Sequence, residues 1–265
     1  MQLSVKGSPV YAHTGGQDFD ATKPAIVFVH GAGMDHTVWG LQARYFAHHG
    51  FAVLAPDLPA HGRSAGAALA SVGAMAGWIA ALMDAAKLGT AALAGHSMGA
   101  LACLEAAARL GPRTTRLILC GAAPRMAVHP ELIAAAEKDP PLARDLIVDW
   151  AFGGRGRIGG NIAAGLWLKA AAQRLIDRAG GAVLAGDFKA CDAYADGEAA
   201  ARTVACPALL ILGRDDRMTP PSAGREFARL MKDAATAELA DCGHMMMLEQ
   251  PDATLEQMKT FLGTT

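Results

Sequence analysis

AALAGHSMGA, residues 91–100, is the stretch of sequence that decides the fold of this chain. Its first half is a short apolar run typical of a buried strand, and an alanine-rich segment of helical period follows at 98–110. Between them stands a GxSxG pattern, whose small residues permit a tight turn that pushes the serine outward above the end of a sheet. A helix N-cap would also explain Ser97, but it would leave the flanking glycines unexplained. The pattern therefore predicts that Ser97 is a nucleophile.

The unit of strand, sharp turn and helix repeats on both sides of this stretch, which is typical of a mostly parallel sheet flanked by helices. The other strands are predicted at 25–30, 51–55, 116–120, 208–212 and 236–239. The other helices are predicted at 37–49, 71–87, 221–231 and 249–262. Between 123 and 202 the sequence has helical but no strand periodicity, which predicts a helical insertion.

A glycine-rich loop follows the strand predicted at 25–30. His30-Gly31-Ala32-Gly33 can turn backbone N–H groups outward, as acyl transfer requires for a developing oxyanion. The natural pair of donors is the N–H of Ala32 and that of Met98, the residue after the serine. A plain strand-to-helix turn is the alternative interpretation of this loop, and His30 is expected to be a hydrogen-bonded structural residue.

Two late loops supply a possible acid and base. Asp215 and Asp216 follow the strand at 208–212, and His244 follows the next strand. In doubly wound sheets the carboxyl ends of strands hold the ligand-binding and catalytic side chains. His244 would take the proton of Ser97 and an aspartate would orient the imidazole. Neighbouring residues point apart, so only one aspartate can reach His244, and the spacing leaves the choice open.

Composition excludes several other functions. The 265 residues are 52% hydrophobic with a net charge of −1, which provides no basic surface for nucleic acid. Five cysteines without CxxC spacing are expected to be reduced thiols, and the histidines lack the spacing of metal ligands, so we expect neither metal nor cofactor. No stretch approaches about 20 apolar residues, and the N-terminus lacks a signal-peptide core, so we expect no membrane partner and a cytoplasmic location. The oligomeric state stays open.

Five motifs in order carry a resemblance to the α/β-hydrolase superfamily: HGAG, DLPAHGRS, GHSMG, LGRDDRMTP and CGHMMMLEQP. The resemblance implies an eight-stranded, mostly parallel sheet flanked by helices. It also implies a core at 1–122 and 203–265 and a helical cap at 123–202. The acid of this family usually ends a Gly-x-x-Asp turn, which implies Asp216 through Gly213. DLPAHGRS, with Asp57 and His61, is expected to be scaffolding.

The resemblance further implies a small-molecule hydrolase, since branches with other chemistry carry aspartate where Ser97 stands. We expect a carboxylesterase of the serine-nucleophile, capped, esterase- or lipase-like branch, acting through an acyl-enzyme on an ester, lactone or thioester of a small to medium apolar acyl group. Trp150, Trp167 and Met245 are predicted to contact the substrate. The alternatives are a hydrolase of carbon–carbon bonds in ring-fission products, a cofactor-free perhydrolase, or a ligand-binding receptor on the same fold.

Overall fold

Alternating apolar side chains give the central sheet two buried faces. In the computed structural model, which describes residues 1–157, 159–161 and 165–263, Val27 and Leu93 pack into one core cluster. Their strand neighbours Ile26 and Ala92 pack into a second cluster on the opposite face. Successive side chains of a strand point to opposite faces, so strands buried on both sides read as continuous apolar runs. For this reason the strand predicted at 91–95 contains no polar side chain.

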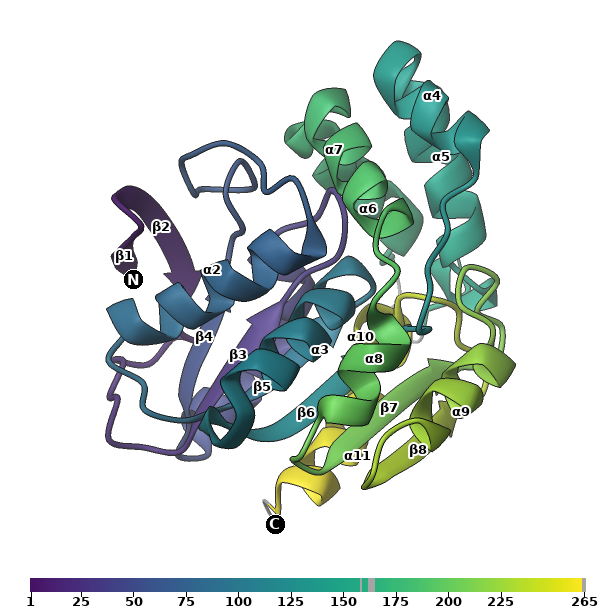
Figure 1. Cartoon of the computed structure of the whole chain (residues 1–265). Helices are drawn as coiled ribbons and strands as arrows, with labels where there is room; N and C mark the ends of the chain where they lie inside the picture. The colour runs from purple at the N-terminus through teal and green to yellow at the C-terminus, as the bar shows by residue number, and fades with distance from the viewer. Residues whose placement is uncertain (158, 162–164, 264–265) are drawn as a thin grey trace.

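The sheet has eight strands in the order β1-β2-β4-β3-β5-β6-β7-β8 (Figure 1). The pairs β1–β2 and β2–β4 are antiparallel and the remaining pairs are parallel. Their bounds are β1 Gln2–Val5, β2 Ser8–His13, β3 Ala25–Val29, β4 Ala52–Pro56, β5 Ala91–His96, β6 Thr114–Cys120, β7 Ala208–Gly213 and β8 Ala234–Leu239. The eight-stranded, mostly parallel sheet is therefore confirmed. Residue periodicity missed β1 and β2, which are short and partly exposed at the sheet edge.

Helices cover both faces of the sheet. The core cluster on one face includes residues of α2 (Val72–Ala85), α3 (Met98–Leu110), α8 (Gly197–Thr203) and α9 (Pro221–Arg229). The opposite face is covered by α1 (Gly40–His48) and α11 (Pro251–Leu262), together with the short helices η1 (His36–Trp39) and α10 (Met246–Glu249). The short helix η2 (Gly111–Arg113) follows α3. The single helix expected at 249–262 begins instead at Pro251, since proline favours the first position of a helix.

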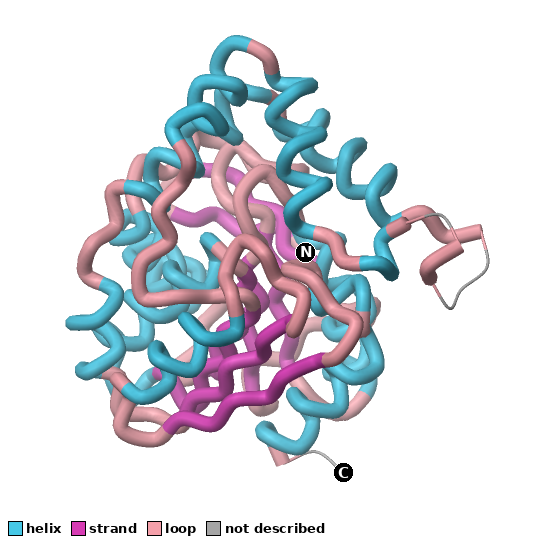
Figure 2. Tube along the Cα trace, turned by 90° about the vertical axis from the view of Figure 1, so that its right-hand side faces the viewer, coloured by secondary structure: helices cyan, strands magenta, loops and turns pink. Residues whose placement is uncertain are grey.

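Four further helices lie beyond the carboxyl ends of the parallel strands (Figures 1 and 2). They are α4 (Pro130–Lys138), α5 (Pro140–Ala151), α6 (Leu168–Ala179) and α7 (Gly181–Asp192), with the short helix η3 (Gly154–Gly156) after α5. The segment predicted to be helical, 123–202, contains residues 158 and 162–164, which lie outside the described residues. Because α8 packs against α3 of the core, we propose that a cap consists of α4 to α7 alone.

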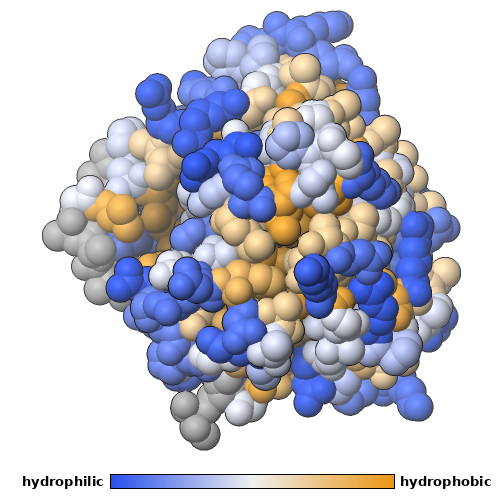
Figure 3. Space-filling view, turned by 90° about the vertical axis from the view of Figure 1, so that its left-hand side faces the viewer, coloured by the Kyte–Doolittle hydropathy of each residue, from blue (hydrophilic) through white to orange (hydrophobic). Residues whose placement is uncertain are grey.

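On the face shown in Figure 3, hydrophilic residues surround several apolar areas. Among the described residues, no helix combines the length and the apolarity that a membrane-crossing segment needs.

Candidate active site

Ser97 stands at the turn between β5 and α3 in a strained backbone conformation. Its φ of 53° and ψ of −118° lie in a region that residues with a side chain rarely adopt. The turn is held by a hydrogen bond from the Ser97 N–H to the carbonyl of Cys120 at the end of β6, 2.9 Å long. The Ser97 side chain is half-buried and lines a cavity. The backbone thus presents Ser97 at the carboxyl edge of the sheet.

Two glycines make this turn possible by close backbone approach. A Cβ atom at Gly95 would lie 2.2 Å from the carbonyl oxygen of Gly99, and one at Gly99 would lie 2.4 Å from the carbonyl oxygens of Val29 and His30. Both distances are far inside van der Waals contact, so any larger residue would push the strand and helix apart. The GxSxG pattern is therefore a packing requirement of the junction.

Asp216 and His244 meet on neighbouring loops. His244 Nδ1 donates to Asp216 Oδ2 over 2.8 Å, and both side chains are buried. The loops approach closely because a Cβ atom at Gly213 would lie 2.1 Å from the carbonyl oxygen of Gly243. Asp215 is exposed, and its backbone N–H donates to Cys242. The structure therefore brings Asp216 to His244 and leaves Asp215 in solvent.

Asp216 is held as an acceptor by four hydrogen bonds. Oδ1 accepts from the backbone N–H groups of Met218 and Thr219, while Oδ2 accepts from the Thr219 hydroxyl and from His244. Burial by itself would raise the pKa of Asp216, but the charge of His244 and these bonds hold the pKa below its usual value. An ionised carboxylate has no proton to donate, so the proton between the two side chains belongs to His244 Nδ1.

His244 Nε2 is thereby left as the basic nitrogen. It is buried and has no hydrogen-bond partner among the described residues. Gly121 places this ring next to the serine turn: a Cβ atom on Gly121 would lie 2.9 Å from His244 Cε1, and the preceding residue, Cys120, accepts the Ser97 N–H. Ser97 and His244 therefore border the same backbone segment.

His96, the first variable residue of the GxSxG pattern, binds the backbone of His244. Its Nε2 donates to the carbonyl oxygen of His244 over 2.9 Å, and the two ring centroids are 4.8 Å apart. Burial, with a smaller contribution from the charge of His244, lowers the pKa of His96 to about 3, so this ring stays neutral. Sequence reasoning missed His96, although a polar residue at the end of an apolar strand was a usable signal.

Glu249 is a second supporting residue that sequence reasoning missed. The buried carboxylate accepts the N–H groups of Gly153, Gly243 and Met245, at 2.8, 3.0 and 3.3 Å. Burial raises the pKa of Glu249 even though these donors oppose the shift. It fixes the loop that carries His244 against the end of α5.

The loop after β3 lies beside the serine. Ala32 lines the same cavity as Ser97, and Met98 begins α3, where the helix itself offers no acceptor for its N–H. His30 Nδ1 donates to the Gly31 carbonyl and Nε2 accepts from the Leu58 N–H. Burial lowers the pKa of His30 to about 4, so it is a neutral structural residue.

Asp57 also makes structural contacts, accepting hydrogen bonds from His36 and from the Arg63 N–H. The ligand atoms of Asp35, His36 and Asp57 lie within 4.8 Å of one another, a spacing that could hold a metal ion. Asp35 is already paired with Arg178 and Asp57 with His36. These side chains therefore link segments of the fold.

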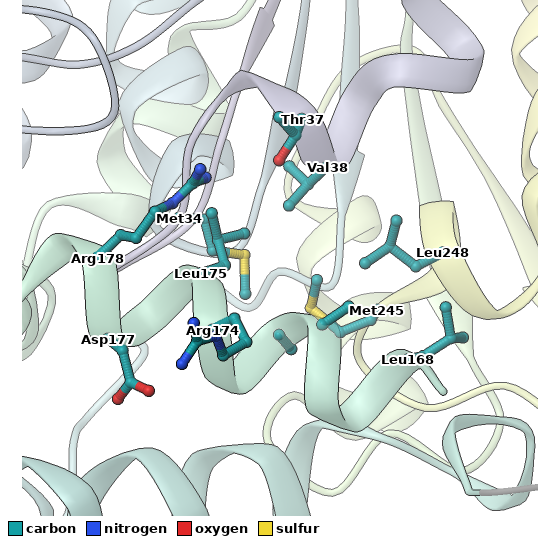
Figure 4. A pocket seen from close by; sticks show the side chains of 12 residues that line it. Met34, Thr37, Val38, Leu168, Arg174, Leu175, Asp177, Arg178, Met245 and Leu248 are labelled. Atoms are coloured by element: carbon teal, nitrogen blue, oxygen red, sulfur yellow. The ribbon is translucent and has the colours of Figure 1, made fainter. Parts of the chain in front are cut away.

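The serine cavity has a volume of about 220 Å³ and largely apolar walls. Trp150 lines it, as predicted for a substrate contact, together with Met126, Leu132 and Phe188. Trp167 does not: it is 46% exposed at the start of α6. Met245 is fully buried and lines a separate groove of about 670 Å³ between α6, η1 and α10 (Figure 4). Of the three predicted contacts, the structure brings only Trp150 to the serine.

Known proteins resemble this chain over nearly its whole length. Residues 26–257 match the model of the Alpha/beta hydrolase family. The (E)-2-((N-methylformamido)methylene)succinate hydrolase of Acinetobacter baylyi is 28% identical over 248 residues, 91% of this chain and 90% of that protein. The enol-lactonase from Burkholderia xenovorans LB400 is 26% identical with a TM-score of 0.88, covering 99% and 100% of the two chains. A thermophilic esterase from Thermogutta terrifontis has a TM-score of 0.84 over 99% and 97% of the chains, and its 20% identity supports the fold alone.

Proposed function

Because the chain belongs to the alpha/beta hydrolase family, we propose that it is a serine hydrolase whose catalytic triad is Ser97, His244 and Asp216. The observation that carries this proposal is the buried 2.8 Å hydrogen bond from His244 Nδ1 to Asp216, which leaves the unpartnered Nε2 as the base. In the proposed reaction Nε2 takes the proton of Ser97 Oγ as Oγ attacks the carbonyl carbon of the substrate. Asp216 stabilises the imidazolium that forms.

The oxygen of the attacked carbonyl becomes an oxyanion in the same step. We propose that the N–H groups of Ala32 and Met98 stabilise it, because both residues adjoin Ser97 and the second begins a helix with a favourable dipole. The tetrahedral intermediate then collapses, and His244 returns its proton to the leaving oxygen. A water molecule, deprotonated by His244, hydrolyses the acyl-enzyme.

The cavity favours a carboxylic ester or lactone with a small to medium apolar acyl group. Its volume of about 220 Å³ lies below the roughly 300–1,000 Å³ of cavities for drug-sized ligands. Trp150, Leu132 and Phe188 provide apolar walls. The likeness to an enol-lactonase supports a lactone as readily as an open ester.

The charge of the cavity lining favours a second candidate, a substrate that carries its own carboxylate. Among the residues that line the cavity, Arg217 is positively charged and none is an aspartate or glutamate. Arg217 is exposed and makes no ion pair with the described residues. The Acinetobacter relative is named as a hydrolase of a succinate derivative, which supports this class of substrate.

The experiment that tests the proposal is hydrolysis of p-nitrophenyl esters from acetate to laurate by the wild-type protein and the Ser97→Ala variant. We expect an optimum at short to medium acyl chains and a loss of kcat on the order of 10⁶-fold in the variant, with an unchanged melting temperature. Equal turnover by both proteins would contradict the triad. Tight binding without turnover would favour a receptor, and activity confined to vinylogous diketone acids would favour a carbon–carbon hydrolase.

A further inference from the structure

Asp187 is a fully buried carboxylate on α7 that the proposed triad does not use. Its Oδ2 accepts the backbone N–H of Gly33 and the Nε2–H of His61, each over 2.9 Å. Its Oδ1 is buried without a hydrogen-bond partner among the described residues. One oxygen thus ties a helix of the proposed cap to two loops of the core.

His61 is positively charged in this arrangement. Its Nδ1 faces the carbonyl oxygen of Pro59 over 3.0 Å and its Nε2 faces Asp187, so both nitrogens meet acceptors and both must carry a hydrogen. Burial would lower the pKa of His61, but the hydrogen bond and charge of Asp187 outweigh it and raise the pKa. The other charged or titratable groups facing this imidazole are Asp57 and the neutral His30, whose ring centroid is 4.9 Å away.

The desolvation of both charges offsets much of the attraction within a buried ion pair, so the stability that it contributes is the part that depends on the protonation of His61. The ion pair also fixes the orientation of the groups that bind Asp187. The N–H of Gly33 lies in the peptide plane that joins Ala32 to Gly33, so the hydrogen bond to Asp187 holds this plane. The N–H of Ala32 lies in the preceding peptide plane, which is linked to the held one only through the φ and ψ angles of Ala32, so the bond narrows its range of orientations. The side chain of Leu184 adds contact from the same helix, because a Cβ atom at Gly33 would lie 2.8 Å from Leu184 Cδ1.

We propose that Asp187 is a positioning residue for the Ala32 oxyanion donor, and that the hydrogen bond from His61 holds the Asp187 carboxylate in place. This inference rests on the proposed serine hydrolase function. It assigns α7 a double role, because Phe188 and Cys191 of the same helix line the serine cavity. A displacement of the helix would therefore change the cavity wall and the oxyanion loop together.

Asp187→Asn is the informative substitution because Oδ2 accepts both hydrogen bonds. An amide that turns its oxygen to this position keeps the Gly33 bond but removes the charge that keeps His61 protonated, and one that turns its nitrogen there opposes the Gly33 N–H. Asp149→Asn is the matched control, since this cap carboxylate is 72% exposed and paired with Lys169.

We expect Asp187→Asn to lower kcat on an ester substrate by about 10- to 100-fold, less than the roughly 10²- to 10³-fold for outright removal of an oxyanion donor. KM should stay within about threefold, and the affinity for a trifluoromethyl ketone, which forms an oxyanion on the serine, should fall in parallel with kcat/KM. A purely structural role would lower the melting temperature and leave kcat/KM and the affinity for the trifluoromethyl ketone unchanged in the folded protein. His61→Gln should not add its full effect to that of Asp187→Asn, because both act through one contact.

Amide hydrogen exchange tests, without an activity measurement, whether Asp187 holds the loop after β3. The peptide containing residues 30–35 should exchange faster in Asp187→Asn than in the wild type or in Asp149→Asn. Unchanged exchange in this peptide, or a kcat within about twofold of an active wild type, would overturn the inference. If the wild type shows no turnover that depends on Ser97, the proposed function fails instead, and the exchange result still decides whether Asp187 holds the loop.

Discussion

Replacing Asp216 by asparagine should invert the proton arrangement of His244. Oδ1 of Asp216 accepts two backbone N–H groups, from Met218 and Thr219, so an asparagine must place its oxygen at that position. Its NH₂ group then falls where Oδ2 receives the proton of His244 Nδ1. Two donors cannot face each other, so Nδ1 must become an acceptor and the proton moves to Nε2. The nitrogen that should remove the serine proton is then already protonated.

The expected loss of kcat follows from this change of tautomer. Substitution of a triad aspartate by asparagine lowers kcat by about 10⁴-fold with geometry preserved, which corresponds to about 5.4 kcal/mol of transition-state stabilisation. The assay is the release of p-nitrophenol from a short-chain ester near pH 8, with kcat and KM determined separately. KM should change little, because Asp216 does not contact the substrate in the proposed mechanism.

Asp215→Asn is the matched control for this variant. It makes the same chemical change one residue away on an exposed side chain, so we expect kcat within about twofold of the wild type. A kcat for Asp216→Asn within tenfold of the wild type, or a loss as large in Asp215→Asn, would refute the tautomer argument. Unchanged melting temperatures would show that the loss is catalytic.

Two further predictions concern charge. Because the folded-state pKa of His61 is raised above 6.5, its ion pair stabilises the protein fully below that pH and loses its effect as pH rises through the folded-state value. The difference in unfolding free energy between wild type and Asp187→Asn should therefore shrink from about pH 6 to pH 9, and a constant difference would contradict the charged pair. Arg217→Gln should lower kcat/KM for monomethyl adipate by about tenfold while leaving methyl hexanoate nearly unchanged, measured as methanol release. Arg214→Gln is the control, because Arg214 is on the same loop as Arg217 but faces Glu238 of β8. Equal losses on both esters would exclude carboxylate recognition by Arg217.

The sequence by itself determined the class of fold, because the features that encode it are local. Buried parallel strands require apolar runs, and the junction around Ser97 requires glycine where the backbones of Gly95 and Gly99 touch other backbones. The strand and the GxSxG pattern that follows it occupy only ten consecutive residues, so they can be recognised from the local sequence. The order of the motifs then placed Asp216 and His244 at neighbouring strand ends. The edge strands β1 and β2 escaped because their short, partly exposed runs carry little hydrophobic pattern.

Only the tertiary structure decided which side chains support the site. Asp187 and Gly33 are 154 residues apart and Glu249 reaches back 96 residues to Gly153, and no local periodicity records such contacts. The family resemblance had implied Asp216 over Asp215, and the structure adds the physical reason, because the Asp216 side chain turns inward to His244 between two loops. Trp150 and Trp167 are both aromatic residues of the predicted cap, yet one lines the serine cavity and the other lies largely in solvent. Residue type makes a side chain suitable for a site, but the packing of distant segments determines whether it reaches that site.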